Sequence, residues 1–120
     1  MSAVQPSRYV PALTRPPLRL GNLLLDEELY EVYLGERRVW LTHLEFRLLV
    51  ELARHAGAIV SRRDLLERVW GDADAPPRRL DVQISRLRSR LAGLEPYTIT
   101  TVRKRGYSLK RPLEPAETAR

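Results

Sequence analysis

The feature that most constrains the fold is a stretch in which apolar and arginine side chains recur with a helical period. It runs from Arg78 to Leu91 and reads RRLDVQISRLRSRL. At about 100° per residue, positions i, i+4, i+7 and i+11 share one face of a helix. The apolar residues at that spacing are Leu80, Ile84, Leu87 and Leu91. The pattern therefore predicts a helix over 78–92 that buries this stripe and exposes a basic face.

The exposed face of this helix carries residue types that contact nucleic acid. Val82, Ser85, Arg86 and Ser89 point outward, and the flanks carry Arg79, Gln83, Arg88 and Arg90. Arginine and glutamine offer donors to base edges or phosphates, and valine offers an apolar contact. An ordinary solvated charged face explains the helix alone almost as well. The distribution of charge along the chain decides between the two interpretations.

The net positive charge is concentrated around this helix. The chain has 21 Lys+Arg and 15 Asp+Glu, a formal net charge of +6. Residues 78–111 hold ten basic residues against two acidic ones, whereas the rest of the chain holds eleven against thirteen. A polyanion is the simplest partner for such a segment. A membrane surface would call for exposed aromatic residues on an amphipathic helix, which no segment supplies.

Composition and motifs remove support from other classes. The chain has no cysteine, which excludes disulfides and thiolate chemistry and agrees with a reducing cytosol. It lacks an apolar run near the about 20 residues of a spanning helix and a secretion signal, so we expect a cytoplasmic protein. His43 and His55 stand alone, without the spacing of a metal site or a triad. We expect no catalytic residue, cofactor or metal.

Proline and glycine positions divide the chain into segments. Residues 1–16 contain three prolines and no apolar period, which indicates a flexible linker or arm. Residues 112–120 indicate a disordered tail, which leaves one domain over 17–111. Within it, short apolar runs separated by turn residues predict a small antiparallel sheet. The expected strands are at 18–20, 23–25, 31–34 and 39–41.

Two helices with clear start and stop signals follow the sheet. Thr42 and Glu45 form a capping box, and Gly57 marks the end of the first helix. The second helix starts at Ser61 and ends at Gly71. The expected buried faces are Leu44, Leu48, Leu49, Leu52 and Ala56 in the first helix, and Leu65, Leu66, Val69 and Trp70 in the second.

The third helix and a hairpin complete the domain. A loop over 72–77 ends in two prolines, which a first helical turn tolerates, and Gly93 marks the helix end. Residues 97–109 then alternate around the basic tip 103–106, which predicts a β-hairpin. The alternating residues are Tyr97, Ile99 and Thr101 before the tip and Tyr107 and Leu109 after it, and Tyr97 and Tyr107 have the parity of the inner face. This order is the layout of a winged helix, in which the third helix enters the major groove.

Residues 17–111 resemble the DNA-binding effector domain of OmpR/PhoB-type response regulators. Four stretches in the family's order carry the resemblance: LTHLEFRLL (41–49), VSRRDLLERVWG (60–71), LDVQISRLR (80–88) and TVRKRGYSL (101–109). The resemblance implies an α+β winged helix-turn-helix fold with an N-terminal four-stranded antiparallel sheet, a three-helix core and a C-terminal β-hairpin wing. It also implies sequence-specific binding of double-stranded promoter DNA by a two-component transcriptional regulator, as a tandem dimer on direct repeats.

The resemblance assigns roles to positions that match the family's motifs. Base contacts are implied for Arg79, Val82, Gln83, Ser85 and Arg86 in the major groove and for Arg103 in the minor groove. Backbone contacts are implied for Trp70, Arg78, Arg88 and Thr101, with Lys104 and Arg105 at the basic tip. The loop with Asp72 and Asp74 resembles the segment that touches RNA polymerase in some relatives.

Two departures from the family pattern are visible. Family wings commonly read Arg-Gly-x-Gly-Tyr, whereas this wing has Lys104 at the first glycine position. Its higher charge predicts a stronger salt-dependent term in DNA binding. The family's receiver domain would need about another hundred residues. We therefore expect either an effector fragment of a longer regulator or a stand-alone relative.

Several residues fit structural roles, and a second functional class stays open. Trp70 fits core packing as well as a phosphate contact, Thr101 fits a strand surface, and Arg90, Arg37 and Arg38 fit solvated charges. A protein-interaction winged helix would use the same basic face to bind an acidic partner or RNA polymerase. RNA binding is weaker, because the helix and wing lack exposed aromatic residues for stacking.

Overall fold

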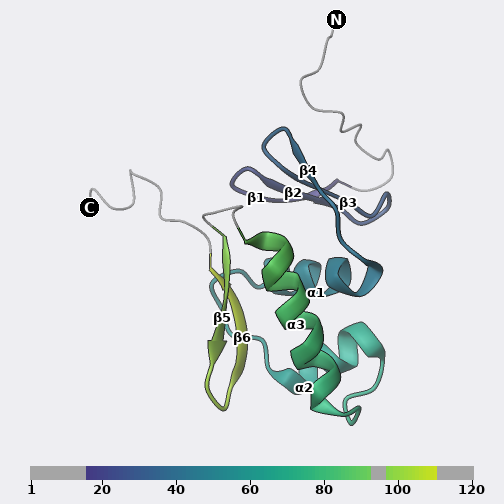
Figure 1. Ribbon diagram of the computed structural model, residues 1–120, viewed down its shortest axis with the longest axis vertical. Helices are drawn as coiled ribbons and strands as arrows, with labels where there is room; N and C mark the ends of the chain where they lie inside the picture. Colours follow the sequence, from purple (N-terminus) through teal and green to yellow (C-terminus); the bar gives the residue numbers. More distant parts are fainter. Residues whose placement is uncertain (1–15, 93–96, 111–120) are drawn as a thin grey trace, which may run out of the picture.

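A computed structural model describes residues 16–92 and 97–110. The predicted linker apart from Pro16, the predicted helix stop at Gly93 and the predicted tail over 112–120 lie outside the described residues. Figure 1 shows the N-terminal sheet at one end of the molecule, α1 beneath it, and the C-terminal hairpin beside α3.

The N-terminal sheet is antiparallel with the order β1-β2-β3-β4. Its strands are β1 (Leu18–Leu20), β2 (Leu23–Asp26), β3 (Glu31–Leu34) and β4 (Arg37–Val39). The fourth strand is present as predicted, but it spans Arg37–Val39 instead of 39–41. A tight turn at Gly35 lets pairing start at once, with Arg37 opposite Leu34 and Val39 opposite Val32. The chain then leaves the sheet at Trp40 to enter α1.

Helix α1 (His43–Arg54) begins as predicted. The Thr42 hydroxyl accepts the Glu45 backbone N–H, and the Glu45 carboxylate accepts the Thr42 N–H at 2.9 Å. The predicted stop at Gly57 is too late, because His55 already caps the last turn. The sheet and α3 both pack on α1, so more of its residues are buried than the predicted stripe contains. Within that stripe, Leu44 and Ala56 are only half-buried. The buried apolar residues are Phe46, Leu48, Leu49, Val50, Leu52 and Ala53.

The predicted second α-helix is α-helical only in its first turn. Helix α2 (Arg62–Leu65) starts at Ser61, whose hydroxyl accepts the Asp64 N–H at 3.0 Å. It continues as the π-helix η1 (Leu66–Trp70), which ends at Gly71 in a left-handed conformation. A π-turn holds more residues than an α-turn, and five residues are too few for an apolar pattern to distinguish them.

Helix α3 (Pro77–Leu91) confirms the opening prediction. Pro77 occupies its first position, and the whole stripe of Leu80, Ile84, Leu87 and Leu91 is buried. Both ends of the helix lie one residue earlier in the chain than the predicted 78–92, which is within the usual uncertainty of helix ends.

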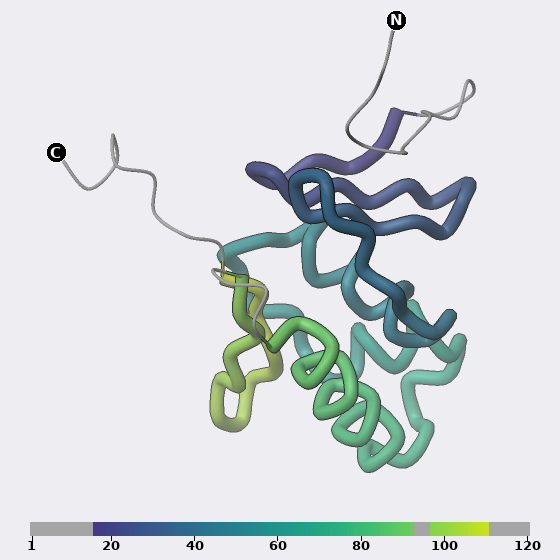
Figure 2. Tube along the Cα trace, turned by 45° about the horizontal axis from the view of Figure 1, so that its top comes forward, coloured from purple at the N-terminus to yellow at the C-terminus, as the bar shows by residue number. Residues whose placement is uncertain are grey.

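The C-terminal hairpin pairs β5 (Thr98–Val102) with β6 (Gly106–Lys110). Tyr97 and Tyr107 are buried as predicted, Ile99 and Leu109 are buried beside them, and Thr101 is exposed, in agreement with the predicted strand-surface position. Tyr107 also bridges to Val60, before α2, so the hairpin is fastened to the helical core. Figure 2 shows the hairpin alongside α3 from a second angle. The α+β winged helix-turn-helix class is confirmed, with its four-stranded sheet, three helical segments and wing.

Candidate nucleic-acid interface

The N-terminal half of α3 borders an open groove of about 490 Å³. The groove forms where the loop after η1 brings the start of α3 back toward Trp70. Six sequence-predicted site residues meet there: Trp70, Arg78, Arg79, Val82, Gln83 and Arg86. Leu44 and Pro76 complete the lining. A mixed lining of guanidinium groups, an amide and apolar side chains suits contact with base edges and phosphates.

The side chains in this groove are available to a ligand. Arg78, Arg79 and Arg86 are exposed, and within the described ranges none of them has a side-chain hydrogen bond or ion pair. Val82 is 37% exposed, so its apolar side chain is accessible from the groove. Trp70 packs partly against the core, as the structural interpretation predicts, and its exposed part lines the groove, where the predicted phosphate contact stays a prediction.

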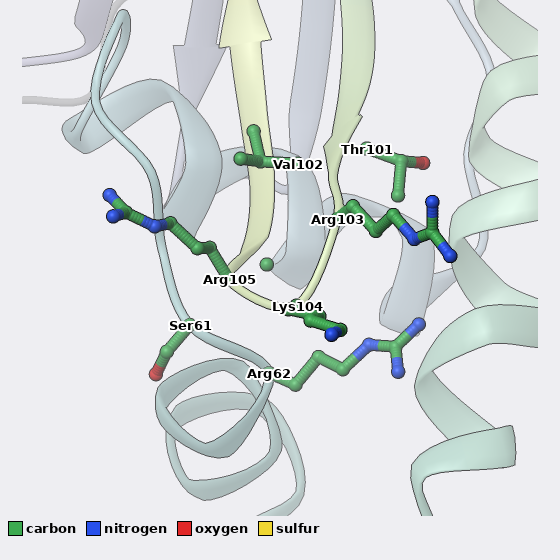
Figure 3. Close-up of a pocket in the computed structure, with 8 residues that line it drawn as sticks. Ser61, Arg62, Thr101, Val102, Arg103, Lys104 and Arg105 are labelled. Atoms are coloured by element: carbon green, nitrogen blue, oxygen red, sulfur yellow. The ribbon is translucent and has the colours of Figure 1, made fainter.

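A second cleft of about 510 Å³ lies between the hairpin tip and the start of α2. The lining includes the predicted wing contacts Thr101, Arg103, Lys104 and Arg105. Figure 3 shows the side chains of Arg103 and Arg62 extending to the same side, whereas Arg105 extends to the opposite side. The basic tip therefore presents charge on two sides instead of as one patch.

Lys104 adopts an unusual backbone conformation at the hairpin tip. Its φ is 65°, in the left-handed region that glycine adopts without steric cost. This is the position where the family pattern has a glycine. Lysine occupies it at a cost of about 1 to 2 kcal/mol, so this wing holds a positive charge in a backbone conformation that favours glycine.

Arg88 and Thr101, which were both predicted to contact the DNA backbone, are hydrogen-bonded to each other. The Arg88 Nη2 donates to the Thr101 Oγ1 at 2.6 Å, and its Nε donates to the Ile99 carbonyl at 3.1 Å. An arginine has five N–H donors, so Arg88 keeps donors for a phosphate after making both bonds. Its position links α3 to β5.

Sequence reasoning missed a cluster that joins α2, α3 and β6. The Tyr107 hydroxyl donates to Asp81 at 2.7 Å, and the Arg62 Nη2 lies 3.0 Å from the same carboxylate oxygen. Burial, followed by the hydrogen bond to Asp81, raises the pKa of Tyr107. The bond to Tyr107 raises the pKa of Arg62. Asp81 was the available signal, because it is the one acid within α3.

Two arginines that fitted solvated charges have protein partners. The Arg90 Nε donates to the Glu45 carboxylate at 3.2 Å, and Glu45 is 1% exposed. The Arg38 guanidinium lies 4.0 Å from the ring centre of Trp40 and 3.6 Å from Glu31. The solvated interpretation is wrong for the half-buried Arg38, whereas Arg90 is exposed although it pairs with Glu45, and Arg37 is exposed. Glu45 thus anchors the end of α3 to the start of α1.

The loop between η1 and α3 is a closed turn with exposed acids. The Asp72 carboxylate accepts the Asp74 N–H at 2.9 Å, and Asp74 pairs with Arg63 at 3.2 Å. Ala75, at the end of the loop, is buried in the core. Both predicted polymerase-contacting residues therefore lie on the surface, beside the Trp70 groove.

The two histidines have local partners. The His43 ring lies 5.2 Å from the Tyr30 ring, and the His55 Nε2 lies 3.0 Å from Arg68. Within residues 16–92 and 97–110, no group of three or more His, Cys, Asp or Glu side chains is arranged to hold a metal ion. The same residues include no helix that has both the length and the apolar character needed to cross a membrane.

Comparisons with known proteins give a consistent family. The family described as transcriptional regulatory protein, C terminal, matches residues 35–109. The heme response regulator HssR of Staphylococcus epidermidis is 41% identical over 92 residues, which is 75% of this chain and 41% of that protein. The chain thus spans less than half the length of this curated relative.

Solved structures agree with the sequence comparison. The DNA-binding domain of Klebsiella pneumoniae RstA, in complex with the RstA box, is 41% identical with a TM-score of 0.69, covering 78% of this chain and 96% of that one. The DNA-binding domain of Escherichia coli CpxR is 33% identical with a TM-score of 0.71, covering 82% of this chain and all of that one.

Proposed function

The chain belongs to the family of C-terminal domains of transcriptional regulatory proteins, the OmpR/PhoB-type DNA-binding domains, and we propose that it regulates transcription by binding double-stranded DNA sequence-specifically. In this proposal α3 lies in the major groove, and the hairpin contacts the backbone and minor groove. Members of this family bind DNA and are not enzymes. This agrees with the expectation drawn from the sequence.

The observation that carries the proposal is the groove beside α3. It collects three exposed arginines that have no protein partner in the described residues, together with Gln83 and the exposed Val82. Unpaired guanidinium groups beside an apolar contact match the major-groove code better than they match a generic acidic protein surface. We assign base reading to Arg86 and its neighbours Arg79, Val82, Gln83 and Ser85, with Arg103 in the minor groove.

Backbone contacts extend the interface on both sides of α3. We assign them to Trp70 and Arg78 in the groove, to Arg88 and Thr101 between α3 and the wing, and to the tip residues Lys104 and Arg105. These contacts position the protein on the duplex without reading its sequence.

We also propose a cellular setting. The chain would be the effector part of a cytoplasmic two-component response regulator, and the name of HssR describes that relative as a response regulator. Two copies would occupy half-sites about one helical turn apart. Asp72 and Asp74 would contact RNA polymerase from their exposed loop, which loss of polymerase capture in an Asp72→Ala, Asp74→Ala variant would support.

The decisive experiment is selection from a randomised duplex library at near-physiological salt, with sequencing of the retained DNA. The proposal predicts an enriched short motif, repeated at about one-turn spacing. Retention without enrichment would make the protein an architectural binder. No retention would favour the protein-interaction alternative, in which the basic face binds an acidic partner.

A salt titration tests the wing separately. Arg105→Ala is expected to weaken specific and random duplexes alike and to reduce the slope of log K against log salt by about one unit. Arg37→Ala is the matched control, since Arg37 is exposed on the distant sheet. An equal change of slope in both variants would show a general charge effect and would remove Arg105 from the interface.

A further inference from the structure

The hairpin and α3 are joined by side-chain contacts that include Asp81, Tyr107 and Arg62, to which no role in DNA contact has been assigned. Asp81 and Arg88 are seven residues apart on α3 and therefore lie on the same side of the helix. Both side chains turn toward the hairpin: Asp81 accepts from Tyr107 of β6, and Arg88 donates to Thr101 and Ile99 of β5. This side lies away from the groove that Val82 and Arg86 line.

The Tyr107 side chain is at the centre of this connection. The guanidinium carbons of Arg62 and Arg88 lie 5.6 and 5.7 Å from the centre of its ring, within the range of a cation–π interaction. Its hydroxyl donates to Asp81 at 2.7 Å, while Arg62 approaches both the hydroxyl, at 3.4 Å, and the Asp81 carboxylate, at 3.0 Å. One residue of the wing thereby contacts charged groups from both α2 and α3.

The negative charge of Asp81 suits the side of α3 that faces the hairpin better than the side that faces DNA. A carboxylate on the DNA-facing side of α3 would repel phosphates. Here its oxygen accepts the tyrosine hydroxyl and faces a guanidinium, so its charge is compensated within the protein. The one acid of α3 is therefore paired within the protein, on the side of the helix that faces the hairpin.

We infer that Tyr107, Asp81 and Arg62 are positioning residues that fix the angle between α3 and the hairpin, so that base reading by α3 and wing contact with the backbone act as one binding event. The inference rests on the proposed DNA-binding function. Two linked contact regions held at the correct angle bind more tightly than two that move independently, because the second contact loses less freedom.

The test is a double-mutant cycle on the duplex selected from the library. In the wild-type background, Arg103→Ala is expected to weaken binding by about tenfold. In the Tyr107→Phe background, the same change is expected to weaken binding by about threefold or less, because a loosely held wing contributes less. Asp81→Asn serves as a second background with the same expected outcome.

Tyr97→Phe is the matched control on the same hairpin. Its hydroxyl bonds to the Leu20 carbonyl and to the Asn22 side chain in the turn between β1 and β2, and within residues 16–92 and 97–110 it makes no hydrogen bond to α3. Removing it should leave the tenfold effect of Arg103→Ala unchanged. An equal Arg103→Ala effect in the Tyr107→Phe and wild-type backgrounds would overturn the inference.

A measurement without DNA separates this inference from the proposed function. Residual dipolar couplings of the free protein should fit α3 and the hairpin to one orientation in the wild type, and to two differently ordered bodies in Tyr107→Phe. A single rigid orientation in that variant would refute the positioning role whatever the protein binds. Equal affinity of the wild type for selected and random duplexes would instead refute the proposed function.

Discussion

Arginine side chains are used differently at the two ends of the molecule. Of the five arginines in the sheet and α1, three have protein partners: Arg38 and Arg54 pair with Glu31 and Glu27, and Arg47 donates to the Arg68 carbonyl at 2.8 Å. Arg19 and Arg37 are exposed and have no hydrogen bond or ion pair within the described residues. At the groove and the wing, the side chains of six cations have no hydrogen bond or ion pair within the described ranges: Arg78, Arg79, Arg86, Arg103, Lys104 and Arg105. A cation that structure leaves unpaired beside a groove is a better indicator of a binding site than net charge.

Not every arginine in the basic half of the molecule lacks a partner. Arg62, Arg88 and Arg90 have protein partners, as Arg38, Arg47 and Arg54 do. The first three connect α3 to α2, to the hairpin and to α1. The binding half therefore contains its own supporting arginines, and the difference between the halves lies in where each side chain points.

The largest expected effect is that of a substitution at Gly106, where the hairpin backbone lies against the backbone of Val60. It tests whether the binding half depends on this close packing. A Cβ at this position would lie 2.1 Å from the Val60 carbonyl oxygen, at a φ of 147°. Gly106→Ala should lower the free energy of unfolding by about 3 kcal/mol, measured by denaturant unfolding. Gly57→Ala is the control, since it has positive φ but open space around it, and should cost about 1 kcal/mol. Similar losses in both would mean that the hairpin can move away from Val60.

The next effect separates paired from unpaired arginines directly. Arg86→Ala should weaken binding to the selected duplex by about 1 to 3 kcal/mol and relax specificity at one base pair. Its free energy of unfolding should change by no more than about 0.5 kcal/mol, because the side chain has no protein partner. Fluorescence titration measures the DNA affinity, and thermal unfolding measures the change in stability.

Arg54→Ala provides the opposite case, since this residue pairs with Glu27 on the surface. It should lower stability by about 0.5 kcal/mol and leave DNA binding unchanged. If Arg86→Ala weakened selected and random duplexes equally, the assignment of that residue to base reading would be wrong.

A smaller effect would sharpen the comparison at the wing tip. Lys104→Gly removes a charge and relieves the positive φ, so stability should rise by at most about 1 kcal/mol while the salt slope falls by about one unit. Lys104→Ala is the matched control: it should show the same slope without the gain in stability. A loss of stability in the glycine variant would show that the lysine side chain supports the turn.

The smallest effect concerns pH. The raised pKa of Tyr107 means that the folded protein favours the neutral phenol. This contribution to stability is fully present below the usual tyrosine pKa of about 10 and is lost as pH rises through the raised value. Unfolding curves at pH 8 and pH 11 should therefore show a larger alkaline loss in the wild type than in Tyr107→Phe. Equal losses would place the tyrosinate in a solvated site.

The features predicted correctly from the sequence are those that local residue patterns encode. The capping box at Thr42 and the buried stripe of α3 are read from residues within one or two turns of each other. The Glu45 pair with Arg90 joins residues 45 apart, and the Tyr107 bond to Asp81 spans 26. No local period encodes such pairs, because they depend on how helices cross. The exposed site residues were placed by their helical positions, whereas their supports required the structure.

The π-helix η1 has a consequence for how relatives should be aligned. A π-turn accommodates an extra residue where an α-helix would have none. A homologous chain that stays α-helical here would need one residue fewer between Leu66 and Trp70 to direct its tryptophan to the same groove. An alignment without a gap would then match Trp70 to a residue rotated by about 100° around the helix. Insertions and deletions at this turn therefore change the composition of the groove as surely as substitutions do.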